Sequence, residues 1–359
     1  MLQSFGRSRR TLSVSIVLAV VVAACSARPT PSLSAGPSTP PSSTPAPTAG
    51  PPEAVRLALD WTPNTDHTGF YVAQAKGWYE QAGVKLQVLP YNAPGPETLM
   101  GSGQADCGIS FQDSLTFAIA AGVKIKSVMA ILQHTASAIA VLADSGITRP
   151  SQLEGKTYAS FGYPNEVPTV KAIIEADGGA GTFNVVTADS TAYEAIYSHK
   201  ADFTIPFTAW EGVEATERGI QLRYFKFQDY GFPDFYQVVL ACSNDWLVAH
   251  PDLAKRFVGA TVRGFQYASD SPDDAAAILI AQNPGVFDAN PKLPLDSARY
   301  LATGGYYVDA SGVVGRQTLE QWTGYSKFLF DHGLLTGPDG KPLASPPDYA
   351  SLFTNEFLP

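Results

Sequence analysis

Short strand-like runs alternate with helical runs along most of this chain, and this alternation limits the folds open to it. The candidate strands are rich in β-branched and aromatic residues. The expected strands are Val55–Asp60, Val84–Pro90, Cys107–Ser110, Lys126–Gln133, Ala136–Ala143, Lys156–Ser160, Asn184–Thr187, Ala201–Ile205, Gln221–Lys226 and Tyr236–Ser243. The helices expected between them include Thr68–Gln81, Pro96–Ser102 and Pro168–Asp177. This order predicts an α/β architecture with largely parallel sheets.

The pattern changes after Cys242, where strand signals end and long amphipathic runs take over. The helices expected here are Pro251–Ser269, Asp273–Gln282, Leu295–Thr303 and Gly312–His332. The body from residue 53 onward is long enough for two domains of ordinary size.

Two segments are the expected domain boundaries: the turn-rich residues 144–156 and the segment Val239–Asn244. Two crossings between two α/β lobes predict a hinged clamshell that closes on a ligand. We assign residues 53–143 plus 243–359 to lobe 1 and residues 144–242 to lobe 2.

Residues 1–24 have the pattern of a secretory signal peptide. Three arginines precede a short apolar run, Leu12–Val22, which is shorter than the ~20 residues of a membrane-spanning helix. The segment Val22–Cys25 resembles a bacterial lipobox, in which the cysteine is lipid-modified and becomes the new N-terminus. We therefore expect lipidation at Cys25; the alternative is a plain signal peptide with a chance cysteine.

Residues 25–52 follow as a segment made almost entirely of Ser, Pro, Thr, Ala and Gly. Such a composition buries too little apolar surface to offset the entropy of ordering, so a disordered tether is expected. The predicted localisation is extracytoplasmic, with the body held at the cell membrane by lipidated Cys25 alone.

The charge of the chain argues against some partners. The formal charge is −9, and it becomes −12 without residues 1–24, which hold three arginines and no acid (21 basic against 33 acidic residues). An acidic body disfavours nucleic acid or anionic lipid headgroups as the main partner. Five histidines lie without metal-ligand spacing, so no metal site is expected. Cys107 and Cys242 lie in apolar, strand-like contexts, where two buried thiols are favoured over a disulfide between them.

The segment Asp60–Ala73 joins the first expected strand to the first expected helix and mixes polar with aromatic residues. Ligands of open α/β sheets bind at the carboxyl ends of strands, which places Asp60 and Trp61 at the mouth of the expected pocket. Asp60, Asn64 and His67 also suit turns and helix caps, and Phe111 suits the core. The ligand-binding candidates in this lobe are Asp60, Trp61, Asn64, His67, Tyr71, Phe111 and Gln112.

The second lobe has the same arrangement after the strand Ala201–Ile205, where Glu211 follows Trp210. A carboxylate at this place can accept two hydrogen bonds from an amidine-like ring edge, although a first-turn acid is also favoured by the helix dipole. Earlier in this lobe, the loop Ser160–Glu166 contains Pro164, which removes a backbone donor and disfavours a phosphate. The candidates in this lobe and at its second crossing are Tyr163, Asn165, Trp210, Glu211 and Tyr236.

At these residues the chain resembles the thiamine-pyrimidine-precursor family of periplasmic-type binding proteins. The resemblance spans residues 55–245 and is carried by the motifs Leu59–Asn64, His67–Gly69, Ala75–Tyr79, Ala82–Val84, Gly101–Asp106, Leu153–Lys156, Trp210–Glu214 and Pro233–Tyr236. It implies a type II periplasmic-binding-protein fold that serves the permease and ATPase subunits of an ABC importer. It also implies a formylaminopyrimidine or hydroxymethylpyrimidine ligand and no cofactor.

Elementary chemistry agrees with a flat heteroaromatic ligand. Such a ring needs aromatic faces for stacking and a few buried acceptors for its amino group. The candidate faces are Trp61, Tyr71, Tyr163, Trp210 and Tyr236, and the candidate acceptors are Asp60 and Glu211. We expect a monomer.

The serious rival is an enzyme, because a eukaryotic branch of this family is a pyrimidine synthase with a pyridoxal-phosphate lysine, a histidine and a cysteine-rich iron motif. In this chain the lysine position reads Ser110 and the histidine position reads Ser114. A Schiff base needs a lysine amine, so we expect no enzymatic activity.

Other rivals keep the fold and change the ligand or the role. Riboflavin or another flavin also has a ring that stacks, so a flavin remains an alternative ligand. A sulfonate, taurine or nitrate is an anion or carries one and would need a basic pocket. A sensory domain or an adhesin built on the same clamshell is a further alternative.

Overall fold

The computed structural model describes residues 51–91, 94–188 and 191–359, all within one compact unit that ends at Pro359. The expected signal peptide, the lipidation site Cys25 and the tether up to residue 50 lie outside the described residues. Within the described ranges, no helix is long and apolar enough to cross a membrane.

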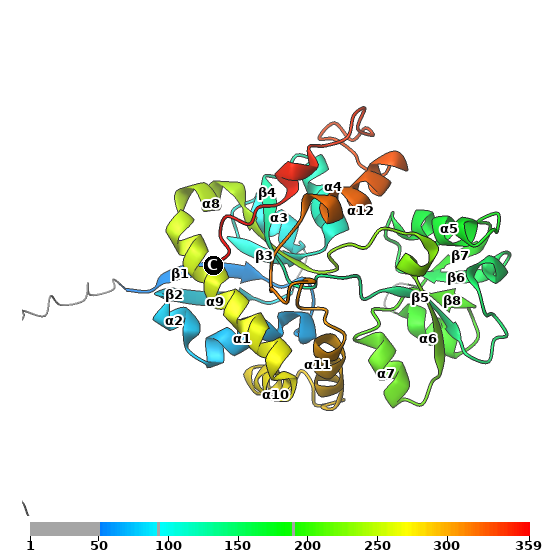
Figure 1. The fold of residues 1–359 in the computed structure, drawn as a ribbon, viewed down its shortest axis with the longest axis horizontal. Coiled ribbons are helices and arrows are strands. Elements are labelled where there is room, and N and C mark those ends of the chain that lie inside the picture. Colours follow the sequence, from blue (N-terminus) through cyan, green and yellow to red (C-terminus); the bar gives the residue numbers. More distant parts are fainter. Residues whose placement is uncertain (1–50, 92–93, 189–190) are drawn as a thin grey trace, which may run out of the picture. The chain divides into compact units, whose positions relative to one another are not determined.

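The first sheet has five strands in the order β2-β1-β3-β10-β4. Their bounds are β1 Glu53–Ala58, β2 Val84–Leu89, β3 Cys107–Ser110, β4 Ile125–Ala130 and β10 Val239–Ser243. Figure 1 labels β1, β2, β3 and β4 of this sheet. Strand β1 runs parallel to β2 and β3, while β10 is antiparallel to both of its neighbours. The carboxyl ends of β1 and β3 therefore point to the same edge, as a ligand site requires.

The second sheet also has five strands, in the order β7-β6-β8-β5-β9. Their bounds are β5 Ala138–Leu142, β6 Thr157–Ser160, β7 Asn184–Thr187, β8 Phe203–Thr204 and β9 Leu222–Lys226. Strand β6 is parallel to β7 and β8, and β5 is antiparallel to β8 and β9. Each sheet thus takes in one antiparallel strand from the segment that follows a crossing.

The sheet assignments correct the expected lobe boundaries at 143/144 and 242/243. The chain crosses between the sheets at residues 131–137 and 227–238, so β5 belongs to the second sheet and β10 to the first. The first crossing is a run of bends, and the second begins with the 3-10 helix Phe227–Tyr230. Backbone hydrogen bonds from Ile131 and Leu132 to Val238 hold the two crossings side by side. The turn residues near Asp144 mark the end of β5 instead.

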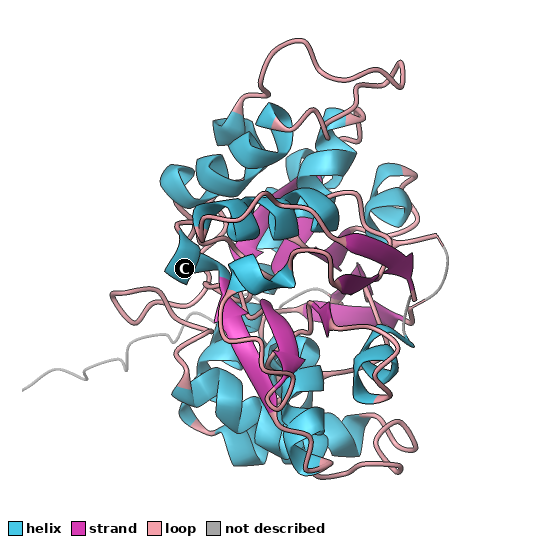
Figure 2. Cartoon of the chain, turned by 90° about the vertical axis from the view of Figure 1, so that its right-hand side faces the viewer, coloured by secondary structure: helices cyan, strands magenta, loops and turns pink. Residues whose placement is uncertain are grey.

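Helices lie on the outer sides of the magenta strands in Figure 2. The helices up to β9 are α1 Thr68–Ala75, α2 Trp78–Gln81, α3 Pro96–Gly101, α4 Gln112–Ala120, α5 Glu166–Ala176, α6 Ala192–Tyr197 and α7 Glu211–Glu217. Those after β10 are α8 Asn244–Ala249, α9 Pro251–Asp270, α10 Pro272–Gln282, α11 Leu293–Thr303 and α12 Leu319–Asp331. The expected helix 312–332 therefore begins only at Leu319. The short 3-10 helices are Thr65–His67, Pro150–Leu153, Phe227–Tyr230 and Tyr349–Leu352.

Close packing between α1 and α9 fixes the first turn of α1. A Cβ atom added to Gly264 would lie 2.0 Å from the carbonyl oxygen of Gly69, so only glycine fits at this crossing. The hydroxyl of Thr65, just before α1, also lies 2.6 Å from that of Ser297 on α11. The segment that carries the Asp-Trp-Thr-Pro-Asn motif is thus held from two sides by later helices.

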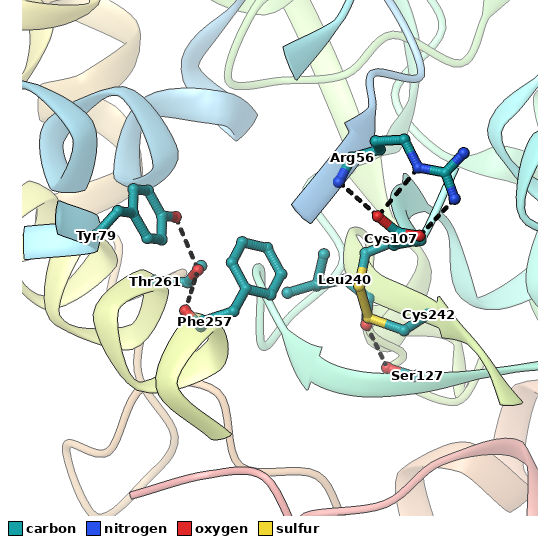
Figure 3. Close-up of a disulfide and its surroundings, with 9 residues drawn as sticks. Arg56, Tyr79, Cys107, Ser127, Leu240, Cys242, Phe257 and Thr261 are labelled. Carbon is teal, nitrogen blue, oxygen red and sulfur yellow. Dashed lines mark hydrogen bonds and ion pairs between the residues drawn. A yellow bond between two sulfur atoms is a disulfide. The ribbon is translucent and has the colours of Figure 1, made fainter. Parts of the chain in front are cut away.

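Cys107 and Cys242 form a disulfide, which corrects the expectation of two separate buried thiols (Figure 3). The two residues lie opposite each other in the antiparallel β3–β10 pair, and both are fully buried. The bond spans 135 residues of sequence, including the whole second sheet. The pairing is not visible in the sequence because it depends on β10 entering the first sheet.

Candidate functional site

The end of β1 carries a hydrogen-bonded group of polar residues. Asn64 caps the 3-10 helix Thr65–His67: its side chain accepts from the backbone amide of Asp66 at 2.8 Å. His67 is fully buried, with its Nε2 atom 2.8 Å from Oδ1 of Asp60. The structure therefore brings three predicted residues together, with Asn64 and His67 engaged in shaping the segment around Asp60.

Trp61 follows Asp60 and stays 48% exposed, which is unusual for so large an apolar side chain. Its ring centroid lies 5.0 Å from that of Tyr91, with the planes tilted by 42°. An exposed aromatic pair beside a strand end offers a stacking face for a ligand ring.

A second aromatic group joins elements of both lobes. Tyr71 on α1 is buried against Leu279 and Phe287, and Trp210 packs on the same group. The rings of Trp210 and Phe287 are 6.4 Å apart in an edge-on arrangement. Because Trp210 precedes α7 of the second lobe, this contact spans the junction between the lobes.

Glu211 begins α7 directly after Trp210, and its carboxylate accepts a hydrogen bond from the backbone amide of Phe207 at 3.1 Å. Burial raises the pKa of Glu211 from 4.5 to about 7, although bonds from Phe207 and Tyr193 act in the opposite direction. A carboxyl group accepts hydrogen bonds when ionised and can also donate one when protonated. Such a perturbed group marks a candidate functional position.

Asp66 is a candidate that the sequence prediction missed. It is 5% exposed, and its Oδ1 atom has no hydrogen-bond partner among the described residues. Burial, followed by the charges of Asp60 and Glu211, raises its pKa well above the ordinary value. Asp66 therefore senses acids from both lobes; nothing in the sequence distinguishes it from an ordinary turn residue.

Two further acids extend this group. Burial raises the pKa of Glu97, and the charges of Asp60 and Asp113 raise it further. Burial also raises the pKa of Asp113 on α4, while Asn165 and Tyr325 hydrogen-bond its carboxylate. We call Asp60, Asp66, Glu97, Asp113 and Glu211 the carboxylate cluster.

The carboxylate cluster has little compensating positive charge. Among the ion pairs of the described residues, His67 is the only basic partner of any member. Buried acids without counter-charges favour their neutral forms or a cationic or N–H-rich guest. No group of three or more potential metal ligands occurs in the described part of the chain. The arrangement therefore suits an amino-bearing organic ligand better than an anion.

The loop before α5 supports the same conclusion, because an acid of the chain itself already occupies its amides. The carboxylate of Glu166 accepts the backbone amides of Phe161 and Tyr163 at 3.0 and 3.1 Å and the hydroxyl of Tyr158 at 2.7 Å. These amides are donors of the kind that a bound phosphate uses at a helix N-terminus. Tyr163 is 64% exposed at the tip of this loop.

Asn165, next to this loop, links the two lobes. Its amide donates to the carboxylate of Asp113 at 2.8 Å and to the hydroxyl of Tyr325 at 2.7 Å. Asn165 is therefore engaged in a contact between α5 and helices α4 and α12.

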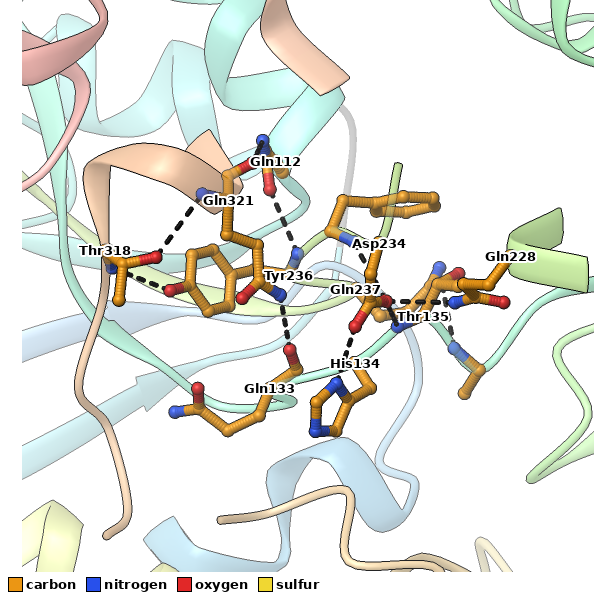
Figure 4. Close-up of polar contacts among 12 residues, drawn as sticks. Gln112, Gln133, His134, Thr135, Gln228, Asp234, Tyr236, Gln237, Thr318 and Gln321 are labelled. Atoms are coloured by element: carbon orange, nitrogen blue, oxygen red, sulfur yellow. Dashed lines mark hydrogen bonds and ion pairs between the residues drawn. The ribbon is translucent and has the colours of Figure 1, made fainter. Parts of the chain in front are cut away.

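Two other predicted residues lie in the junction between α4, α12 and the second crossing (Figure 4). Gln112 is fully buried: its amide donates to the backbone carbonyls of Gln321 and Trp322, and its oxygen accepts the amide of Tyr236. The hydroxyl of Tyr236 accepts the amide of Thr318 at 2.7 Å. The polar atoms of Gln112 and Tyr236 are thus already hydrogen-bonded within the protein, and we leave both residues out of the site proposed below. Phe111 packs against the core of the first lobe.

A cavity of about 800 Å³ lies elsewhere, between α7, β9 and α11. Its lining includes Lys226, Lys292, Arg299 and Tyr300, and none of the twelve predicted ligand residues. Lys292 and Arg299 form ion pairs with acids of their own surroundings. No member of the carboxylate cluster lines this cavity, although Gly212, the neighbour of Glu211, does.

Comparison with known proteins identifies the family of the chain. The family described as NMT1/THI5 like matches residues 64–275, more than half of the chain and the part that holds Asp66 and Glu211. The chain belongs to the NMT1/THI5-like family. The resemblance inferred from the motifs is confirmed.

Proteins similar to this chain include binding proteins and enzymes. The formylaminopyrimidine-binding protein of Halalkalibacterium halodurans is 26% identical over 80% of this chain and 87% of its own. The riboflavin-binding protein RibY of Chloroflexus aurantiacus is 25% identical over 98% of both chains. The 4-amino-5-hydroxymethyl-2-methylpyrimidine phosphate synthase THI12 of Saccharomyces cerevisiae is 26% identical over 85% of this chain and 88% of its own.

Solved structures confirm the fold. The alkanesulfonate-binding protein SsuA of Xanthomonas axonopodis pv. citri matches 85% of this chain and 99% of its own with a TM-score of 0.63 at 14% identity. The expected type II periplasmic-binding-protein clamshell of two α/β lobes is thus confirmed.

Proposed function

We propose that this chain is the extracytoplasmic substrate-binding lipoprotein of an ABC importer, and that it captures an aminopyrimidine precursor of thiamine between its lobes. The ligand is a formylaminopyrimidine or a hydroxymethylpyrimidine. Trp61 stacks on the ring, and Asp60 and Glu211 accept its N–H groups. The protein works as a monomer with permease and ATPase partners.

The observation that carries this proposal is the carboxylate cluster beside an exposed tryptophan. The charges of Asp60 from one lobe and Glu211 from the other both raise the pKa of Asp66, and His67 is the basic partner of Asp60. An aminopyrimidine supplies amino donors, a basic ring nitrogen and a flat face. The similarity to a formylaminopyrimidine-binding protein supports the same ligand class.

The synthase relatives leave an enzymatic alternative, which we do not favour. Ser110 and Ser114 stand where the resemblance expects the lysine and the histidine. The hydroxyl of Ser110 donates to Glu97, and no lysine takes that position. Schiff-base chemistry needs a lysine amine.

A flavin is the second candidate ligand, favoured by the similarity to the riboflavin-binding protein. Its ring also stacks, but its carbonyl edge would face the carboxylate cluster. Sulfonate, taurine and nitrate are disfavoured because Glu166 already fills the loop amides that an anion would need.

The first test is a thermal-shift screen of the chain, extracted from membranes in detergent, against aminopyrimidines, thiamine, riboflavin, taurine and nitrate. A ligand at 100 times its Kd adds about 2.7 kcal/mol to the free energy of unfolding, which gives a clear shift. A selective response to an aminopyrimidine supports the proposal. A response only to riboflavin or to anions contradicts the proposed ligand.

The proposed anchor needs its own test. Metabolic labelling with a fatty acid should mark the wild-type chain and leave a Cys25→Ala variant unlabelled. Labelling of both chains, or of neither, contradicts lipidation at Cys25.

A further inference from the structure

Asp66 is a buried acid whose hydrogen-bonding capacity is not filled by the protein. It is 5% exposed, and Oδ1 has no partner among the described residues. The capping bond in its own turn uses its backbone amide, which donates to Asn64. An unsatisfied buried polar atom costs stability, so its presence in a native fold calls for an explanation.

The surroundings of Asp66 point to a ligand. The charge of Asp60, from the same lobe, and that of Glu211, from the other lobe, both act on its carboxyl group. The hydroxyl of Tyr307 also feels the charge of Asp66, and donates to the backbone carbonyl of Thr65 at 3.3 Å. The unpartnered oxygen thus lies on a carboxyl group that acids of both lobes influence.

We propose that Asp66 is a ligand contact that determines specificity: it pairs with a protonated ring nitrogen or amino group and selects basic heteroaromatic amines over oxo analogues. This inference rests on the proposed function and deepens it by naming the residue that reads the basic edge of the ring. An oxo analogue has a carbonyl oxygen at that edge, which does not become a cation. The partial negative charge of this oxygen would be repelled by the carboxylate cluster.

The proton balance of this step closes within the complex. Burial and the neighbouring acids favour the protonated carboxyl when the site is empty. A neutral basic ring takes that proton: the carboxyl O–H bond breaks, a ring N–H bond forms, and the product is an ion pair. A charge-assisted hydrogen bond then joins the two partners.

The test compares two probes on the chain extracted in detergent: 4-amino-5-hydroxymethyl-2-methylpyrimidine and its 4-oxo counterpart. Calorimetry should show that Asp66→Asn weakens binding of the amino probe about 10- to 100-fold and changes binding of the oxo probe much less. The matched control is Asp106→Asn. That acid is similarly buried but pairs with Arg56 at 2.6 Å, so its loss should lower stability and leave the preference intact.

A second measurement uses the wild-type chain and needs no folded variant. Difference infrared spectroscopy should show a protonated-carboxyl band that disappears with the amino probe and stays with the oxo probe. An unchanged preference in Asp66→Asn, or no loss of the band, overturns the role of Asp66 while leaving the proposed function standing. A wild-type chain that binds no aminopyrimidine overturns both.

Discussion

The Nε2 atom of His67 lies 2.8 Å from Oδ1 of Asp60, across the turn that leaves β1. The other ring nitrogen accepts the backbone amide of Asn64 at 3.3 Å, which makes Nε2 the donor to Asp60. His67 is fully buried and Asp60 nearly so. The histidine is therefore a positioning residue that aims one carboxylate of the cluster and closes the turn.

Replacing His67 by alanine should lower the free energy of unfolding by about 1–3 kcal/mol, because a buried carboxylate and a backbone amide both lose their partner. Urea denaturation measures this change. The matched control is His332→Ala, since that histidine is exposed at the end of α12. Equal stability losses in the two variants would contradict the positioning role.

Glu211 should make the protein less stable as the pH rises. Its pKa is raised from 4.5 to about 7, so the folded chain holds a proton between these values that the unfolded chain has lost. The contribution of Glu211 to stability is then fully present below pH 4.5 and falls by up to about 3 kcal/mol as the pH passes 7. Denaturation at several pH values should show a flatter dependence in Glu211→Gln than in wild type or in Glu214→Gln. Identical slopes in all three would show that Glu211 is not the titrating group.

The disulfide should be a large part of the stability of the first lobe. It closes a loop with a sequence separation of 135 residues, which predicts a loss of about 2–5 kcal/mol on reduction. Denaturation with and without a reductant measures the effect. A Cys107→Ala, Cys242→Ala double variant is the control, because its stability should not respond to reductant. Equal stability of the oxidised and reduced chains would rule this contribution out.

Trp61 is expected to carry ligand stacking. Loss of the ring in Trp61→Ala should weaken aminopyrimidine binding by about 1–3 kcal/mol with little loss of stability, because the side chain is 48% exposed. Calorimetry measures the affinity. Trp246→Phe is the control, because that tryptophan lies on α8 and not in the segment that follows β1. A variant that binds as tightly as wild type would remove Trp61 from the site.

The α/β architecture can be predicted from the sequence because it depends on local patterns, and the same patterns predict where the candidate site lies. Strand and helix periodicities indicate most of the elements, and the rule for strand ends assigns both Asp60 and Glu211 to the expected pocket. The crossings cannot be found in the same way. The second crossing does contain turn residues, in the 3-10 helix Phe227–Tyr230 and at Gly231, but the turn at Asp144 lies inside the second lobe, so turn residues alone do not distinguish a crossing from a turn within a lobe.

The other differences between the predicted and the observed structure arise from tertiary contacts. Gln112 follows a strand as a ligand residue would, but α12, which arrives some 200 residues later in the chain, takes up its side chain. Asp66 looks like a turn residue until the charge of Glu211 is taken into account. The pairing of Cys107 with Cys242 depends on the register of β10. Such contacts depend on packing between distant segments, which a local pattern does not encode.

Asp234 joins the two crossings and should control how firmly the hinge is held. Its carboxylate accepts the amide of Thr135 at 3.0 Å, Nδ1 of His134 at 2.6 Å and the side chain of Gln228 at 2.9 Å. Burial raises its pKa, but these hydrogen bonds outweigh burial and lower it; the bond to Asp234 in turn raises the pKa of His134. The contribution of the pair is fully present below the ordinary pKa of a histidine and is lost as the pH rises through the raised pKa of His134.

Replacing Asp234 by asparagine should lower the pKa of His134 and speed hydrogen exchange at the amide of Thr135. The cost in stability should be about 1–2 kcal/mol, mostly from the bond to the backbone, because solvent screens the half-exposed His134. Nuclear magnetic resonance reports the histidine titration and the exchange in one sample. The control is Asp229→Asn, an exposed acid on the neighbouring 3-10 helix. If both variants leave His134 and Thr135 as in wild type, Asp234 does not hold the crossings together.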